Sequence, residues 1–267
     1  MERPELSLIF PIYNFGKGLQ RNIQAVLYYL ESRGYSYEII CVNDCSTDDT
    51  EAEISAVMKT NTRIKYLRND KNLGKGGSIK KAVTLAVGDY IIFTDGDCIP
   101  LADFVARHRL LSEPGCFLSG NRLLLSQAFT QQVLREKIPI HVWQLGKWLK
   151  ARFQGGINRL TPLLRLPDLD WLRKRAPQRW QGAKTCNLSA YRADLLRVNG
   201  LDESYTGWGQ EDSDLVVRLI RAGLINKSAR FAAPVLHLWH KENDRSHLAE
   251  NQLRLQQVLH ATHIRAH

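Results

Sequence analysis

The sequence predicts an α/β protein in which one sheet lies between two layers of helices. Short apolar runs of strand length alternate with stretches of helical periodicity through roughly the first 120 residues. Polar residues recur directly after these apolar runs. Because strands joined by helical crossovers pair in parallel, we expect a three-layer sheet whose ligand site lies beyond the carboxyl ends of the strands.

The predicted elements follow one another in a regular order. The first strand is stopped by Pro11, and the helix after it places Leu19 and Ile23 on one face. Ser46 and Thr47 follow the second strand, and we expect them to cap the next helix. The predicted strands cover residues 6–10, 38–42, 64–67, 90–93 and 116–119, and the predicted helices cover residues 17–33, 75–87, 101–112, 210–222 and those after 246.

The periodic pattern breaks after about residue 125 and resumes near residue 184. Between these points tryptophan is mixed with leucine and arginine without a clean period, so we interpret residues 126–183 as a basic, mobile, helical insertion. The sequence therefore predicts an α/β half over residues 1–125, this insertion, a second half over residues 184–245 and a terminal helix over residues 246–267. No internal repeat or low-complexity linker separates them.

Charge is unevenly distributed along the chain. The formal net charge is +10, and residues 147–184 hold ten basic and two acidic residues, which contribute +8 of it. Such an imbalance suggests an anionic partner near one face of the protein, and the candidates are a phosphate-bearing glycan, an acidic lipid surface or nucleic acid.

Nothing in the sequence suggests export or a membrane span. No apolar run approaches the roughly 20 residues that cross a bilayer, and the amino terminus leads into a strand without signal-peptide features. We therefore expect a cytoplasmic protein. The cysteines form no CxxC pair, so we interpret them as buried free thiols and not as disulfides or a zinc site; they are Cys41, Cys45, Cys98, Cys116 and Cys186.

An aspartate turn, Asp95-Gly96-Asp97, directly follows the fourth predicted strand. Two carboxylates can hold a hard divalent cation and leave positions open for phosphate oxygens, and glycine permits the tight turn. Such triplets are common in solvated turns, but the position after a strand favours a metal site. His237 and His240 follow a later strand-like run and are candidate ligands, with packing as the alternative role for His237.

Two other strand exits carry candidate nucleotide contacts. Asp44 ends the second strand and could accept a hydrogen bond from the N–H of a uracil or thymine ring; the alternative is that its segment only caps a helix. Lys75 lies in a glycine-rich loop, residues 72–77, that runs into a helix start, and it is a candidate anchor for a diphosphate. A plain loop before a helix would also explain these glycines.

The stretch GWGQEDSD, residues 207–214, is the most specific local signal. Acidic residues at the start of a helix are stabilised by its dipole, which explains the acids in general. It does not explain Trp208 between two glycines, which suits a flexible loop that closes over a sugar. An acidic side chain here could act as general base on an acceptor hydroxyl.

Taken together, these motifs resemble the family 2 inverting glycosyltransferases, which have a GT-A fold, a Rossmann-like three-layer α/β/α domain. The resemblance covers about residues 5–125 and 183–242. It implies that Asp44 binds the nucleobase and that the aspartate turn is the family's D-x-D metal motif. The residues that resemble the base-cradling strand exit are Pro11, Ile12, Tyr13 and Asn14.

The second half is similar to the G-W-G-x-E-D signature of galactosyltransferases and chondroitin polymerases. The resemblance implies that Asp212 is the general base and that Glu211, Trp208 and Gly209 contact the acceptor. It assigns the downstream metal-ligand histidine of the family to His240. The chain departs from the family pattern at residue 210, where glutamine replaces a small residue and could alter the loop or the donor preference.

The resemblance also implies the reaction. A UDP-sugar would bind the half formed by residues 1–125, and a glycan or lipid-linked acceptor would bind residues 184–245. Mn²⁺, with Mg²⁺ as the alternative, would be held by Asp97 and His240, while Asp95 and Gly96 serve the metal or the donor. Inversion gives a β-linkage, and bacterial lipopolysaccharide or surface polysaccharide synthesis is the setting that the family suggests.

Two other functions fit parts of the sequence. A sugar nucleotidyltransferase would need a glycine-rich loop with arginine directly after the first strand, where this chain has residues 11–14 instead. A basic binding module would use residues 147–184, but no nucleic-acid motif accompanies them, so we expect no nucleic-acid partner. We expect this stretch to contact an anionic membrane or a phosphorylated lipid-linked acceptor on the inner face of the cytoplasmic membrane; the alternative is a solvated basic lid.

Overall fold

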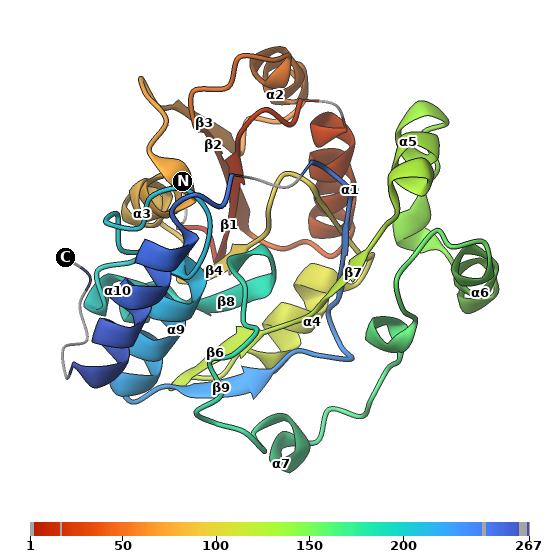
Figure 1. Ribbon diagram of the computed structural model, residues 1–267. Coiled ribbons are helices and arrows are strands. Elements are labelled where there is room, and N and C mark those ends of the chain that lie inside the picture. The colour runs from red at the N-terminus through yellow and green to blue at the C-terminus, as the bar shows by residue number, and fades with distance from the viewer. Residues whose placement is uncertain (1–2, 17, 242–243, 262–265, 267) are drawn as a thin grey trace.

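A computed structural model describes residues 3–16, 18–241, 244–261 and 266 (Figure 1). Its centre is a seven-stranded sheet in the order β3-β2-β1-β4-β8-β6-β9. A second sheet has the order β5-β10-β7. The strands are β1 (Leu6–Ile12), β2 (Tyr37–Asn43), β3 (Ile64–Arg68), β4 (Tyr90–Phe93), β5 (Cys98–Pro100), β6 (Cys116–Ser119), β7 (Arg122–Leu124), β8 (Leu188–Tyr191), β9 (Ile225–Ser228) and β10 (Val235–His237).

The predicted parallel pairing is confirmed for the first four strands and needs one correction beyond them. β3, β2, β1 and β4 are parallel neighbours. β8, which comes about 70 residues after β6 along the chain, lies antiparallel between β4 and β6. The sheet is therefore mixed, because a strand from the second half of the chain is inserted at a position that the alternating pattern cannot specify.

Helices cover both faces of this sheet, which confirms the predicted three layers (Figure 1). On β1, Leu8 and Phe10 pack with α1, α2 and α4, whereas Ile9 packs with α3, α8 and α9 on the opposite face. The helices are α1 (Leu19–Ser32), α2 (Thr50–Met58), α3 (Gly74–Leu85), α4 (Phe104–Leu111), α5 (Gln127–Arg135), α6 (Leu145–Phe153), α7 (Asp170–Arg173), α8 (Arg192–Arg197), α9 (Glu211–Arg221) and α10 (Leu248–His260).

Some predicted helix ends differ from the observed ones. α2 begins at Thr50, and neither Ser46 nor Thr47 caps it; Asp48 accepts from the Thr50 backbone N–H instead. The predicted start of α1 at residue 17 lies outside the described residues, as do residues 262–265 and 267 of the terminal helix predicted over residues 246–267. The other predicted helices are present within a few residues of their expected bounds.

The insertion packs on the small sheet. α5 and α6 share a third apolar core with β5, β7 and β10, and this core includes Val133, Leu123 and Leu236. Trp148 of α6 is 2% exposed within it, so this tryptophan is a core residue and is not available for stacking or membrane insertion. The predicted helical character of the insertion is present in α5, α6 and α7.

The cysteines are free thiols. Four of them are buried, as predicted, whereas Cys45 is partly exposed. In the part of the chain that the structure describes, no helix combines the length and the apolarity needed to cross a bilayer.

His108 on α4 is a buried group that makes stability depend on pH. Its Nδ1 lies 2.7 Å from Ser189 Oγ and its Nε2 lies 3.1 Å from Asn187 Oδ1. Burial lowers the pKa of His108 to about 4. The unfolded chain therefore binds a proton that the folded chain excludes, and stability is lost as pH falls below the ordinary histidine pKa of about 6.5.

We expect the free energy of unfolding to fall by about 2 kcal/mol between about pH 7.5 and about pH 5 through this one group. Urea unfolding at both pH values checks this. His108→Gln keeps a hydrogen-bonding side chain without the titration, so its stability should change less over this range. An equal loss in the variant would mean that other groups cause the pH dependence.

Candidate active site

Four polar strand exits meet at one edge of the large sheet. The parallel strands β1, β2, β3 and β4 end side by side, and backbone hydrogen bonds join the segments that leave them, from Asp44 N–H to Ile12 O and from Asn69 N–H to Asn43 O. Asp44 is buried and its Oδ1 accepts from Asn69 Nδ2 at 2.9 Å and from Leu73 N–H at 2.8 Å. The predicted gathering of polar groups is therefore present.

The exit of β1 is held by the segment after β2. Asn14 has a left-handed backbone, with φ of 47°, and its N–H donates to Ser46 Oγ at 2.9 Å. Its own side-chain oxygen accepts from Thr47 N–H at 2.8 Å. Ser46 and Thr47 thus support the predicted base-cradling loop instead of capping a helix. Ile12 lies in the core, so only its backbone can face a ligand, whereas the Tyr13 side chain is exposed.

Asp97, His237 and His240 form a cluster at the junction of the two sheets. His240 Nε2 lies 3.1 Å and His237 Nε2 lies 3.5 Å from Asp97 Oδ2. One ligand atom of each residue lies within 4.8 Å of those of the others, which fits a single divalent cation. Antiparallel pairing of β5 with β10 places Cys98, next to Asp97, opposite His237, so the small sheet brings these distant residues together.

Hydrogen bonding prepares His240 for this role. Its Nδ1 lies 2.7 Å from the Lys241 carbonyl, which accepts only from an N–H, so Nε2 is the nitrogen that faces Asp97. The hydrogen bond to Asp97 raises the pKa of His240. Burial opposes ionisation of Asp97, but the His240 hydrogen bond and the two imidazoles lower the pKa of its carboxyl to about 2.

Asp95 lies beside Lys75 and not in the histidine cluster. Lys75 Nζ lies 2.8 Å from Asp95 Oδ2 and 3.9 Å from Asp212 Oδ1. Burial alone would lower the pKa of Lys75, but the charges of Asp212 and Asp95 raise it well above its ordinary value. Burial raises the pKa of Asp95 against the opposing charge of Lys75, and its Oδ1 is buried without a hydrogen-bond partner. One lysine therefore joins the aspartate turn to the acidic pair of α9.

The glycines beside Lys75 have a packing role. A side chain at residue 76 would lie 3.1 Å from the backbone oxygen of Asp202, and one at residue 77 would lie 2.9 Å from Leu73 Cβ. The predicted loop does run into the start of α3. Close contacts of the helix thus explain two of its glycines, and a phosphate-binding role rests on Lys75 itself.

The acidic pair at the start of α9 is asymmetric. Asp212 is 3% exposed, and its Oδ1 accepts from Thr185 N–H at 3.2 Å and from Thr185 Oγ1 at 2.5 Å. Burial opposes its ionisation, but Lys75, Lys184 and Thr185 lower the pKa of Asp212. Glu211 has a buried Oε2 without a hydrogen-bond partner, and burial with the neighbouring Asp212 charge raises its pKa to about 7. At neutral pH Asp212 is ionised and Glu211 is partly protonated.

The loop before α9 is packed on α10. Asn251 Nδ2 donates to the backbone oxygen of Thr206 at 2.9 Å, and Arg245 lies over the Trp208 ring at 4.8 Å. Gln210 has a φ of 78°, a left-handed conformation that favours glycine, so the departure from the family pattern falls at a strained position. Closure of this loop over a sugar, as the sequence suggests, would have to break these contacts and stays a prediction.

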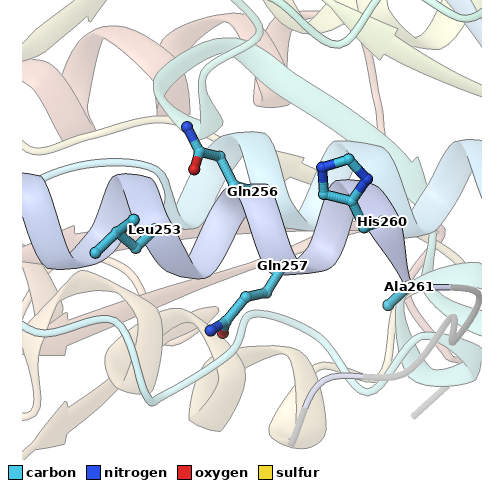
Figure 2. Close-up of a pocket in the computed structure, with 5 residues that line it drawn as sticks. All are labelled: Leu253, Gln256, Gln257, His260 and Ala261. Atoms are coloured by element: carbon cyan, nitrogen blue, oxygen red, sulfur yellow. The ribbon is translucent and has the colours of Figure 1, made fainter.

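An open hollow on the outer side of α10 contains none of the candidate site residues (Figure 2). Amide, imidazole and small apolar side chains line it; they are Leu253, Gln256, Gln257, His260 and Ala261.

The sequence did not single out Thr185 or Lys184, which hold Asp212 in place, whereas Asn69, which holds Asp44, lies in the polar exit expected after the third predicted strand. The side chains of the first two are recognisable only through contacts between segments far apart along the chain. The one signal for them was the regular pattern that resumes at residue 184.

Comparisons with known proteins agree with this fold. The three-layer sheet and its strand-exit turn define the GT-A fold class. A model of glycosyl transferase family 2 matches residues 7–144, and a second model, described as the N-terminal domain of galactosyltransferase, matches residues 173–241. The chain therefore belongs to glycosyl transferase family 2.

Individual relatives match over shorter stretches. Dolichyl-phosphate beta-glucosyltransferase ALG5A of Trichomonas vaginalis is 33% identical over 97 residues, which are 34% of this chain and 30% of that protein. Glycosyltransferase GlyG of Streptococcus pneumoniae is 32% identical over 94 residues, 35% of this chain and 30% of that protein. The chain thus matches less than a third of the length of these relatives.

Two solved structures show the same fold at low identity. The mannosyltransferase PcManGT from Pyrobaculum calidifontis, in complex with GDP-Man and Mn²⁺, has a TM-score of 0.61 at 17% identity, with 97% of this chain and 63% of that one covered. GalNAc-T7 with UDP, GalNAc and Mn²⁺ has a TM-score of 0.62 at 14% identity, with 90% and 45% covered.

Proposed function

We propose that this protein is an inverting, metal-dependent glycosyltransferase. It moves a hexose or N-acetylhexosamine from a UDP-sugar to a hydroxyl of a glycan or lipid-linked acceptor and forms a β-linkage. The main observation behind this proposal is that one lysine pairs with both acidic motifs. Lys75 Nζ lies 2.8 Å from Asp95 of the aspartate turn and 3.9 Å from Asp212 of the acidic pair.

The donor side comprises the strand exits and the metal cluster. Asp44, Tyr13 and the backbone of residues 11–14 are suited to hold the nucleobase, as their strand-exit positions support. The donor set of Asp97, His237 and His240 fits Mn²⁺, with Mg²⁺ as a weaker match to imidazole nitrogen. Such an ion supplies positive charge where the diphosphate leaving group becomes more negative.

Lys75 has two roles in this proposal. In this structure it offsets part of the negative charge of Asp95 and Asp212. Its charge lies between the aspartate turn and the acidic pair, so a diphosphate held at the turn would lie within its reach, and the lysine could turn from the carboxylates to the phosphate.

The acceptor side comprises the start of α9. Asp212 is proposed as the general base because it is ionised at neutral pH and because Thr185 orients its carboxylate. Glu211, with a pKa of about 7, can donate or accept a hydrogen bond and is suited to orient the acceptor beside Trp208 and Gly209. Attack from the face opposite the leaving group would invert the anomeric centre.

The proposal is tested by a screen of UDP-sugars for UDP release, with and without Mn²⁺. We expect a chelator to abolish release and Mn²⁺ to restore it. Asp97→Ala and His240→Ala should each lower the rate at least about 100-fold, since a metal contributes several kcal/mol of charge stabilisation. His247→Ala is the control, because this histidine is half exposed and lies outside the cluster.

Release that is unaffected by the chelator, or by both cluster variants, would contradict the metal role. Transfer products with the donor's anomeric configuration retained would contradict inversion. Bacterial surface polysaccharide or lipopolysaccharide synthesis is the setting that we propose from the family resemblance.

A further inference from the structure

The outer face of α6 carries an apolar stripe that the described part of the chain leaves exposed. Leu145 is 55%, Leu149 is 40% and Phe153 is 88% exposed. Residues at these spacings lie within about 80° of one another around a helix. The same helix buries Trp148 and Ala151 toward the small sheet, so α6 has two separate apolar faces and only one of them is packed.

Basic side chains flank the exposed stripe. Lys150 and Arg152 are exposed, and the helical period places them on opposite sides of the stripe, whereas the exposed Lys147 lies on the far side of the helix, over the Trp143 ring. No acidic residue occurs over residues 137–167. Among the described residues none of these three side chains forms an ion pair, whereas Arg165, farther along the same stretch, pairs with Asp103 at 2.9 Å.

We propose that α6 docks the protein on an anionic lipid bilayer. The helix would lie in the plane of the interface, with Leu145, Leu149 and Phe153 among the acyl chains and with the basic side chains extended to the headgroups. This charge pattern identifies an anionic bilayer as the binding partner. Basic side chains beside an apolar stripe complement a surface that is negatively charged outside and apolar inside. A second copy of this chain would bring like charges together.

The docking face and the candidate active site belong to one packed unit. Trp148, on the inner side of α6, shares a core with Leu236 of β10, and the next residue of that strand is His237 of the metal cluster. Docking would hold the site close to the lipid headgroups. The docking proposal does not depend on the proposed transfer. Only the preference for a lipid-linked acceptor, which docking would favour, rests on the proposed function.

Co-sedimentation of the intact chain with vesicles tests the proposal. Vesicles of phosphatidylglycerol and phosphatidylethanolamine should bind the protein roughly 30-fold more tightly than phosphatidylcholine vesicles, because the two basic side chains beside the stripe each contribute about 1 kcal/mol near the surface. About 0.5 M salt should remove most of this preference. Leu149→Ser with Phe153→Ser should weaken binding at least about 10-fold, and Lys150→Gln with Arg152→Gln should remove the lipid preference.

Leu253→Ser on α10 is the matched control, since Leu253 is also exposed, at 60%, but does not belong to such a stripe; it should bind like the wild type. UDP release without vesicles should be the same in the α6 variants and the wild type, which separates docking from transfer. Equal binding to neutral and anionic vesicles would overturn the proposal. So would apolar variants that bind normally, or a wild-type dimer that these variants convert to a monomer without any lipid binding.

Discussion

Asp212→Asn is expected to lower kcat about 1,000-fold, the middle of the range for loss of a general base. The amide keeps the size of the side chain, and its oxygen can still accept from Thr185, which donates to Asp212 Oδ1 through its N–H and its hydroxyl. The variant therefore loses the proton acceptor without losing its position. Single-turnover transfer to the acceptor found in the donor screen measures the effect.

Two further variants distinguish the loss of the general base from the loss of other carboxylates. Glu211→Gln should raise KM for the acceptor more than it lowers kcat, since its proposed role is to orient the acceptor. Glu203→Gln is the control, because Glu203 is an exposed carboxylate that pairs with Lys80. Near-normal kcat in Asp212→Asn would exclude Asp212 as the base, and a large loss of kcat in Glu211→Gln alone would assign the role to Glu211.

Asp214→Ala is expected to destabilise the fold by about 3–5 kcal/mol. Arg218 is fully buried, and its Nη2 lies 2.6 Å and its Nε 2.9 Å from Asp214 Oδ2. Its remaining Nη1 donates to the Val198 carbonyl at 2.6 Å, which ties α9 to the end of α8. Removal of the carboxylate leaves an uncompensated guanidinium in the core, and urea unfolding at neutral pH measures the cost.

The chain provides a matched comparison for this pair. Arg254 and Glu250 have the same i,i+4 spacing on α10 at 2.8 Å, but their side chains are 38% and 52% exposed. Glu250→Ala should therefore cost less than about 1 kcal/mol. The double variant Asp214→Leu with Arg218→Met should recover much of the lost stability, since apolar pairs often replace buried ion pairs without penalty. Similar costs at the two pairs would mean that burial does not set the effect.

The sequence by itself determined the first half of the fold and most of the donor side. The strands of that half are short, mainly apolar runs, and each exit is a polar turn, as at Asp44 and Asp95. Strands that are joined by helices pair in parallel, which places their exits at one edge of the sheet. The polar residues that follow each strand could therefore be placed together before any contact was known.

Only the tertiary structure decided which side chains meet across the two halves. The antiparallel insertion of β8, the burial of Trp148 and the pairing of Asp214 with Arg218 all depend on contacts between distant segments or on which face a helix buries. Lys75 likewise reaches Asp212 across 137 residues of chain. Local periodicity specifies elements and their exits, but long-range pairing depends on the packing of complete layers, which no local window contains.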